Sequence, residues 1–342
     1  IGISDVDHVA LNQDSHANLN KKISYAVTHR PDLKLVLDRI RNKRKRSGVL
    51  DLLATEFPGE QIRAQLHPVE HHVAHLSSAF HCSPFESATV VSVDGFGDFA
   101  SAAWGRGEGV NIDVEERVYF PHSLGVFYQA MTQFLGFPKY GDEYKVMGLA
   151  SYGRPTYLPQ MREIVQLLDD GSFRLSLDYF QHHRKKISYE REDGSPTFGA
   201  LYSSALQDLL GPSRTPDQPL EDRHRDMAHS VQAMYEAAFF HLLNRLQEQH
   251  GMDAVAVAGG CGMNSVANGR IRRNTAYRNV YVQAAAGDAG GALGAAYSAW
   301  HRLGHEVRVP MRHAAWGPEY SEQDCMGLLE REQQRLQAAD CQ

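Results

Sequence analysis

The sequence has no apolar run long enough to span a membrane, and no signal peptide is visible at its start. It has only four cysteines among 342 residues, and no two of them form a CxxC pair. Scattered thiols of this kind indicate an intracellular, cytoplasmic protein rather than a secreted one held by disulfides. A strong positive charge is also absent. The formal net charge is −6, which argues against a general nucleic-acid-binding protein.

Several familiar catalytic patterns are missing as well. No Gly-Lys-Ser/Thr follows a glycine turn, so the chain has no Walker phosphate loop. No convincing Ser-His-Asp set is evident. The HHVAH segment at 71–75 lacks the Glu that HExxH peptidases carry directly after the first histidine. A peptidase function is therefore disfavoured, and the chemistry must come from other residues.

The segment 66–80, LHPVEHHVAHLSSAF, predicts a helix that begins near Pro68. The apolar residues of one face recur at helical spacing and are Val69, Val73, Leu76 and Phe80. His71 and His75 are four residues apart on another face, so their imidazoles can converge on a first-row metal ion. A helix with two ordinary histidines is the alternative. His72 is expected to point toward the apolar face, in the core or behind the ligands.

A first glycine turn follows a buried strand at 86–94. Gly95 and Gly97 allow backbone N–H groups to approach an anion closely, which favours phosphate binding, with Ser101 in the next strand. Asp94 could help to hold a metal ion or a water molecule. A plain β-hairpin turn explains the same Asp-Gly sequence equally well.

A second glycine turn lies at 255–268, VAVAGGCGMNSVAN, where a buried strand runs through Gly259 and Gly260 into a predicted helix. Helix N-termini bind phosphates through free N–H groups and the helix dipole. Asn264 and Asn268 are four apart and could reach ribose or phosphate oxygens. A tight strand-to-helix turn with exposed polar positions is the alternative.

Two further residues are candidates for the site. Asp288 precedes an Ala- and Gly-rich helix, where it could serve as the N-cap or as the third ligand beside the two histidines. Lys145 lies in the segment 141–150, GDEYKVMGLA, and is a candidate catalytic residue because it could neutralise a phosphate or a developing oxyanion. Most helical lysines are simply solvated, so this pattern is weak by itself.

The order of the predicted elements indicates an α/β protein with two lobes around a cleft. The strands at 86–94, 100–106 and 114–120 predict an antiparallel meander. Strands at 254–258 and 279–282 alternate with helices at 262–272 and 289–303, which predicts βαβα. We expect a first lobe at 1–210, a linker at 211–219, a second lobe at 220–321 and a tail at 322–342. A polar insertion at about 155–198 closes over a site or forms a surface loop, and a predicted helix at 32–47 ends in a basic run.

Taken together, these segments resemble the O-carbamoyltransferases of antibiotic tailoring and nodulation-factor decoration. The motifs, which occur in the expected order, are HHVAH (71–75), VDGFGDFAS (93–101), SLGVFYQAMTQFLGF (123–137), EYKVMGLASYG (143–153), GGCGMNSVANGRI (259–271), GDAGGALGAA (287–296) and MRHAAWGPEYS (311–321). The resemblance implies two ribonuclease H-like lobes of the actin, sugar-kinase and heat-shock-chaperone superfold. It places the chain near the catalytic subunit of tRNA threonylcarbamoyl transferase.

The resemblance also implies a reaction. The family makes carbamoyl-adenylate from carbamoyl phosphate and ATP and then passes the carbamoyl group to a hydroxyl of a small-molecule acceptor. By this resemblance His71, His75 and Asp288 hold a divalent metal ion, iron(II) in the first place and zinc or manganese otherwise. The segment 94–97 would cradle phosphate, and Gly259, Gly260 and Asn264 would face the nucleoside.

Two departures from the family pattern are expected to matter. A first strand hairpin, with a His-Asp pair and the general base, would lie before Ile1, and a carbamoyl-adenylate-forming domain would follow residue 321. We therefore expect this chain to bind nucleotide and metal without turnover. The alternatives are a tRNA threonylcarbamoyl transfer subunit, a non-catalytic nucleotide-binding scaffold and a sugar kinase.

Overall fold

The computed structural model describes residues 2–29, 48–184, 189–192 and 195–338. The predicted helix at 32–47 and its basic run fall outside the described residues. The chain forms two compact units, Ile1–Pro310 and Met311–Gln342, and the second contains helix α13 (Glu322–Ala338). Within the described residues, no helix combines the length and the apolar composition needed to span a bilayer.

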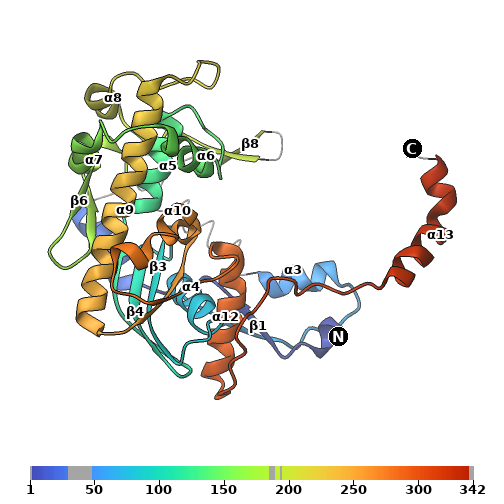
Figure 1. Cartoon of the computed structure of the whole chain (residues 1–342). Helices are drawn as coiled ribbons and strands as arrows, with labels where there is room; N and C mark the ends of the chain where they lie inside the picture. Colours follow the sequence, from blue (N-terminus) through green and yellow to red (C-terminus); the bar gives the residue numbers. More distant parts are fainter. Residues whose placement is uncertain (1, 30–47, 185–188, 193–194, 339–342) are drawn as a thin grey trace. The chain divides into compact units, whose positions relative to one another are not determined.

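A five-stranded mixed sheet forms the centre of the first unit (Figure 1), with the order β11-β10-β3-β4-β5. Its strands are β3 (Ser87–Gly97), β4 (Ala100–Glu108), β5 (Asn111–Tyr119), β10 (Ala254–Ala258) and β11 (Asn279–Val282). The antiparallel pairing of β3, β4 and β5 confirms the predicted meander. Strand β10 pairs in parallel with both β3 and β11, so the sheet joins segments from both sides of the predicted linker.

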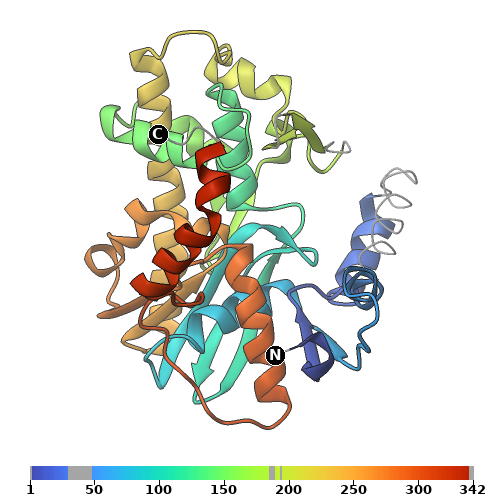
Figure 2. The same cartoon turned by 90° about the vertical axis from the view of Figure 1, so that its right-hand side faces the viewer.

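Alternation along β3 assigns each face of the sheet to different helices, because successive strand side chains point to opposite faces. Val91 and Val93 belong to the large core with α5 (Leu124–Phe134) and α9 (Asp222–His250). Ala88 and Val90 belong to a second core with α4 (His71–Phe80). Helix α12 (Asp288–Arg302) packs against α4, as Figures 1 and 2 show. The helix with the candidate histidines is thus held between the sheet and α12.

The first eighty residues supply a smaller parallel pair of strands, β1 (His8–Leu11) and β2 (Gln65–Pro68). Pro68 is the last residue of β2, and α4 begins at His71, so Pro68 ends a strand instead of starting the predicted helix. Helices α1 (Leu19–His29) and α3 (Val49–Glu56) lie between these strands in sequence.

The segment at 155–198, which the sequence predicts as a polar insertion over a site or a surface loop, contains regular structure. Its elements are α7 (Leu158–Ile164), the hairpin of β6 (Val165–Leu167) and β7 (Phe173–Leu175), the short 3₁₀ helix η3 (Leu177–Tyr179), and the hairpin of β8 (Tyr189–Glu192) and β9 (Ser195–Phe198). Nearby helices are α6 (Glu143–Leu149), the 3₁₀ turn η2 (Ala150–Tyr152) and α8 (Ser204–Leu210). Met161, Ile164 and Phe173 are buried in the large core, so this segment packs as an integral part of the first unit.

The single helix predicted at 262–272 is wrong. Three short elements replace it: η4 (Gly260–Met263), α10 (Ser265–Asn268) and α11 (Ile271–Asn274). The side chain of Asn264 caps α10 by accepting from the Ala267 N–H, and such a cap starts a new helix rather than continuing one. Gly269 and Arg270 then separate α10 from α11.

The α/β class is therefore confirmed as a mixed sheet flanked by helices. The other sheets of the described residues have two strands each. The finer assignment, two ribonuclease H-like lobes divided near 211–219, stays a prediction.

Candidate metal centre

Helix α4 carries the two candidate histidines in its first two turns. Glu70 precedes it as the N-cap, and its Oε2 accepts from the Val73 N–H at 2.9 Å. The Nε2 atoms of His71 and His75 lie 3.0 Å apart, and both residues are buried. The spacing of four residues thus does bring the two imidazoles to one point.

Asp94, in β3, completes the inner part of the group. Its Oδ2 lies 2.9 Å from the Nε2 of His71 and 3.0 Å from that of His75. Its Oδ1 accepts from the N–H groups of Gly95 at 2.7 Å and Gly260 at 3.0 Å. The carboxylate expected beside a phosphate turn therefore points at the histidines.

Asp288 approaches the same point from α12. Its Oδ1 lies 3.6 Å from the Nε2 of His71 and 3.5 Å from that of His75. Gly287 is the N-cap of the helix, so the N-cap role considered for Asp288 is wrong. The side chain of Asp288 is 67% exposed, which leaves this side of the group open to solvent.

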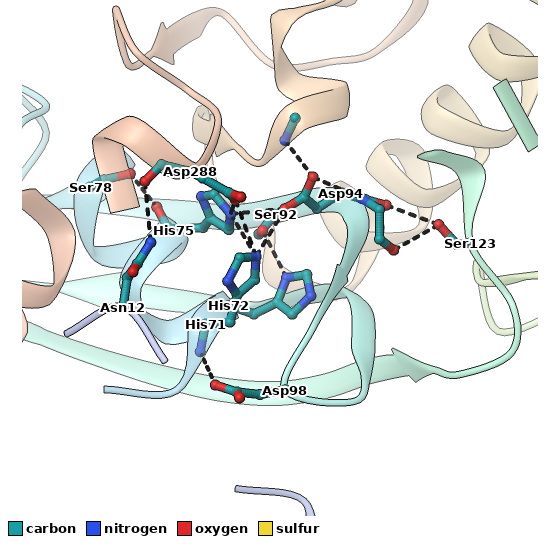
Figure 3. A network of polar contacts seen from close by, with 12 residues as sticks. Asn12, His71, His72, His75, Ser78, Ser92, Asp94, Asp98, Ser123 and Asp288 are labelled. Atoms are coloured by element: carbon teal, nitrogen blue, oxygen red, sulfur yellow. Dashed lines mark hydrogen bonds and ion pairs between the residues drawn. The ribbon is translucent and has the colours of Figure 1, made fainter. Parts of the chain in front are cut away.

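The four side chains form a group whose ligand atoms all lie within 4.8 Å of one another (Figure 3). Two imidazoles and two carboxylates are a donor set that suits iron, zinc or manganese. The three buried or half-buried members fix the geometry. The exposed Asp288 leaves one side of the group open to a further ligand.

The charges of these groups support the same interpretation. Burial lowers the pKa of His75, but the carboxylates of Asp288 and Asp94 outweigh it and raise the pKa to about 9. Burial raises the pKa of Asp94, yet contacts with His71 and His75 hold it well below its usual range. The two carboxylates thus favour a positive charge between the imidazole nitrogens, which is where a cation would lie.

Hydrogen bonds of neighbouring polar residues support the four candidate ligands. The Nδ1 of His72 lies 2.9 Å from the Ser92 hydroxyl, and burial with the nearby His71 lowers the pKa of His72 to about 4. This buried position agrees with the role expected for His72. The Ser123 hydroxyl donates to the backbone oxygens of Asp94 and Gly95.

Asp98 is a contributor that the sequence analysis missed. Its Oδ2 accepts from the N–H groups of His71 at 2.9 Å and Asp14 at 2.7 Å. Its backbone has a φ of 48°, a conformation that is uncommon for residues other than glycine. Burial raises the pKa of the Asp98 carboxyl. The spacing Asp94-x-x-x-Asp98 in a glycine turn was the available signal.

Position 97 has to be a glycine because its backbone lies directly against the His71 ring. A Cβ at this position would lie 2.0 Å from the His71 ring, whereas a Cβ at Gly95 would meet no atom within 4 Å. The absence of a side chain at Gly97 therefore lets β3 and α4 bring Asp94 and His71 together. Phosphate binding by this turn stays a prediction.

The second glycine turn also contacts the group. Gly259 has a φ of 91°, and its N–H donates to the Ala286 backbone oxygen at 2.8 Å. A Cβ at Gly260 would lie 2.6 Å from the Asp94 Oδ1. The N–H groups of both glycines are thus donated to protein acceptors, and their contact with a nucleoside stays a prediction.

The remaining candidates make contacts of their own. Asn264 exchanges two amide hydrogen bonds with Gln232, at 2.9 and 3.0 Å. Asn268 donates to the Gly262 backbone oxygen, and the buried Ser101 hydroxyl donates to the His122 backbone oxygen. Lys145 Nζ forms an ion pair with Asp142 at 2.6 Å. Their predicted nucleotide and catalytic roles are untested by these contacts.

Comparison with known proteins identifies the family to which the chain belongs. The family model described as Carbamoyltransferase N-terminus matches residues 16–297, so the chain belongs to the carbamoyltransferase family. The chain is 38% identical over 253 residues to protein sll1178 of Synechocystis, covering 73% of this chain and 39% of that protein. It is 35% identical over 272 residues to the nodulation protein NolNO of Sinorhizobium fredii, covering 78% and 36%.

The chain therefore spans about two-fifths of the length of these relatives. Among solved structures, it is similar to HypF of T. kodakarensis at 17% identity with a TM-score of 0.37, covering 74% of this chain and 39% of that chain. The match to the family model and the identity with NolNO confirm the family resemblance that the motifs indicated.

Proposed function

We propose that the chain carries the transfer site of a carbamoyltransferase that moves a carbamoyl group from carbamoyl-adenylate to a hydroxyl of a small-molecule acceptor. The observation that carries the proposal is the convergence of His71, His75, Asp94 and Asp288 within 4.8 Å. The family membership, and a relative named as a nodulation protein, agree with this function. Carbamoyl-adenylate would be formed from carbamoyl phosphate and ATP, in line with the family reaction.

The residues fit a resident divalent cation, with iron(II) as the first candidate. His71, His75, Asp94 and Asp288 would hold it, and a bound cation would polarise the carbamoyl carbonyl or a phosphate oxygen as a Lewis acid. Asp98 fixes the start of α4 through the His71 N–H. The Ser123 hydroxyl and the Gly260 N–H orient the Asp94 main chain and carboxylate.

Proton transfer from the acceptor hydroxyl requires a base that the four candidate ligands do not provide while they hold a cation. Lys145 remains the proposed electrostatic contributor. Its ammonium group lies beside Asp142 and near the rings of Phe137 and Tyr144, and an ammonium with three N–H donors can meet an anion while it keeps this ion pair.

The proposal is tested by supplying the chain with freshly prepared carbamoyl-adenylate, iron(II) and a panel of hydroxyl-bearing small molecules. Mass spectrometry should detect metal-dependent binding of the adenylate by the chain, in line with the expected binding without turnover. Asp288→Ala should abolish this signal, and Asp222→Ala, at an exposed aspartate at the start of α9, should not. Adenylate binding that is identical with and without metal would contradict the proposal.

A further inference from the structure

A hollow of about 360 Å³ lies between the end of β5, the turn that follows it and the β6–β7 hairpin. None of the four candidate ligands lines it. Its principal polar and aromatic lining residues are Arg117, Tyr119, His122, Ser172 and Arg174. This volume falls at the lower end of the range of small-molecule sites.

Two arginines line the hollow. Arg174 forms no ion pair with any described carboxylate, whereas Arg117 pairs with Glu70. The Nζ of Lys21 lies 4.9 Å from the centre of the Tyr119 ring. Glu70 pairs with Arg117 and caps α4, and Asp170 accepts from the N–H and the hydroxyl of Ser172. The guanidinium donors of Arg174 are therefore the ones left for a ligand on this side of the hollow.

His122 contributes another donor. Its Nδ1 lies 3.2 Å from the Leu175 backbone nitrogen and accepts from that N–H, which places the imidazole proton on Nε2. Burial, with Arg174 and His183 nearby, lowers the pKa of His122 to about 4, so the ring is neutral at pH 7. A neutral ring with its Nδ1 occupied can only donate through Nε2.

Arg117 adds a buried donor. Its NH2 group meets Glu70 Oε2 at a long 3.3 Å, and its Nε is buried without a hydrogen-bond partner among the described residues. A buried donor of this kind gains more from a ligand oxygen than an exposed one would. The same arginine links the hollow to Glu70, the N-cap of the helix that carries His71 and His75.

We propose that this hollow binds the phosphate group of a small anionic ligand. The donors come from three segments, β5 with Arg117, the turn with His122 and the β6–β7 hairpin with Arg174. Donors on three sides match the three free oxygens of a phosphate monoester better than the two oxygens of a carboxylate. Val118, Leu168 and Phe173 provide an apolar wall for the rest of the ligand.

Inorganic phosphate is the probe for the test. It is titrated into the chain with a chelator present throughout, so that the result does not depend on the candidate metal centre or on the proposed function. Calorimetry should detect binding, and Arg174→Gln should raise the Kd about tenfold, which corresponds to the loss of one charged hydrogen bond. Arg302→Gln, an exposed arginine on α12, is the matched control and should leave the Kd unchanged.

A second measurement keeps the test independent of any folding defect. In the unaltered ¹⁵N-labelled chain, the imidazole resonances of His122 should shift as phosphate is added, and those of the exposed His16 should not. Equal Kd values for the wild-type chain and Arg174→Gln, or no shift at His122, would overturn the proposal. Acetate binding as tight as phosphate binding would overturn the assignment to phosphate.

Discussion

At the scale of single residues, the candidate metal centre depends on groups that are not ligands. Gly97 gives the His71 ring its space, Asp98 holds the N–H at the start of α4, and Ser123 holds the backbone beside Asp94. Such supporting groups orient ligands and tune their affinity for a metal ion. Variants of these positions should therefore change metal binding without removing any ligand atom.

Gly97→Ala is the sharpest variant of this kind. The added Cβ would lie 2.0 Å from the His71 ring, so the ring or the strand must shift. We expect the metal affinity to fall about tenfold to a hundredfold, as is typical when the support of a ligand is lost. Calorimetric titration with manganese measures the effect.

Gly95→Ala is the matched control for Gly97→Ala. A Cβ at Gly95 meets no atom within 4 Å, and this glycine lies next to Asp94 in the same turn. Its metal affinity should equal that of the wild-type chain. An equal loss in both variants would show that the turn as a whole, and not the approach of Gly97 to His71, governs the centre.

Part of this residue-scale picture was accessible from the sequence. The spacing of His71 and His75 predicted two converging imidazoles because helical periodicity is local. For Asp94 the sequence left two explanations open, a residue that helps to hold a metal ion or a water molecule and a plain hairpin turn. The pattern did not decide between them, because only the packing of α4 on the sheet brings that carboxylate to the histidines.

At the scale of elements, the close packing of α4 and α12 brings the two histidines and Asp288 of the candidate metal centre together. Helix α4 supplies the histidines, and α12 begins at Asp288. A Cβ at Gly294 would lie 1.8 Å from the Ala74 backbone oxygen, so the helices touch backbone to backbone at this point. Gly294 is thus explained by the packing of α12 on α4.

Gly294→Ala should therefore separate the two helices. Overpacking of this kind destabilises a fold by about 1–3 kcal/mol. Urea denaturation should show a lower midpoint, and the metal affinity should fall because Asp288 moves away from His75. Gly148→Ala in α6 is the control, since no atom lies within 4 Å of its Cβ position. Its midpoint should stay the same or rise; a fall as large as that of Gly294→Ala would argue against the packing explanation.

The elements that the sequence misplaced share a cause. The start of α4 is set by the Glu70 cap rather than by Pro68, and the 262–272 helix is split by the Asn264 cap. Both caps are side-chain hydrogen bonds to backbone N–H groups that compete with the helical pattern. Periodicity alone does not reveal which of several polar residues will make such a bond.

At the scale of the whole molecule, one sheet connects segments that lie far apart in sequence. Val93 within β3 and Gly259 after β10 come into contact because the two strands pair in parallel. The sequence predicted both strands and the meander, but not this pairing, because it depends on packing across more than 150 residues. The family resemblance indicated the residues of the candidate site more directly than the predicted order of strands and helices did.

The buried histidines give the molecule a predictable response to acid. Burial lowers the pKa of His81 to about 3 and that of His182 to about 4, below the ordinary value of 6.5. Between pH 6.5 and about 4, these histidines are protonated in the unfolded chain but stay neutral in the folded chain. The free energy of unfolding should therefore decrease as the pH is lowered through this range, by about 1.4 kcal/mol per pH unit for each histidine.

His81→Leu isolates one of these contributions. His81 accepts from the Ser77 hydroxyl through Nδ1 and donates to the Val110 oxygen through Nε2, so the variant should be less stable at pH 7. Its unfolding free energy should nevertheless fall less steeply between pH 6.5 and 4.5, because one proton site is gone. Urea melts at several pH values give both slopes, and parallel slopes would contradict the assignment of this proton to His81.

Metal content tests the central claim most directly. The 342-residue chain is loaded with iron(II) or manganese without oxygen, dialysed, and analysed by inductively coupled plasma mass spectrometry. We predict one equivalent in the wild-type chain and in His16→Ala, an exposed control, and far less than one equivalent in His75→Ala and in Asp288→Ala. A full equivalent retained in both of the last two variants would contradict a metal centre at these residues.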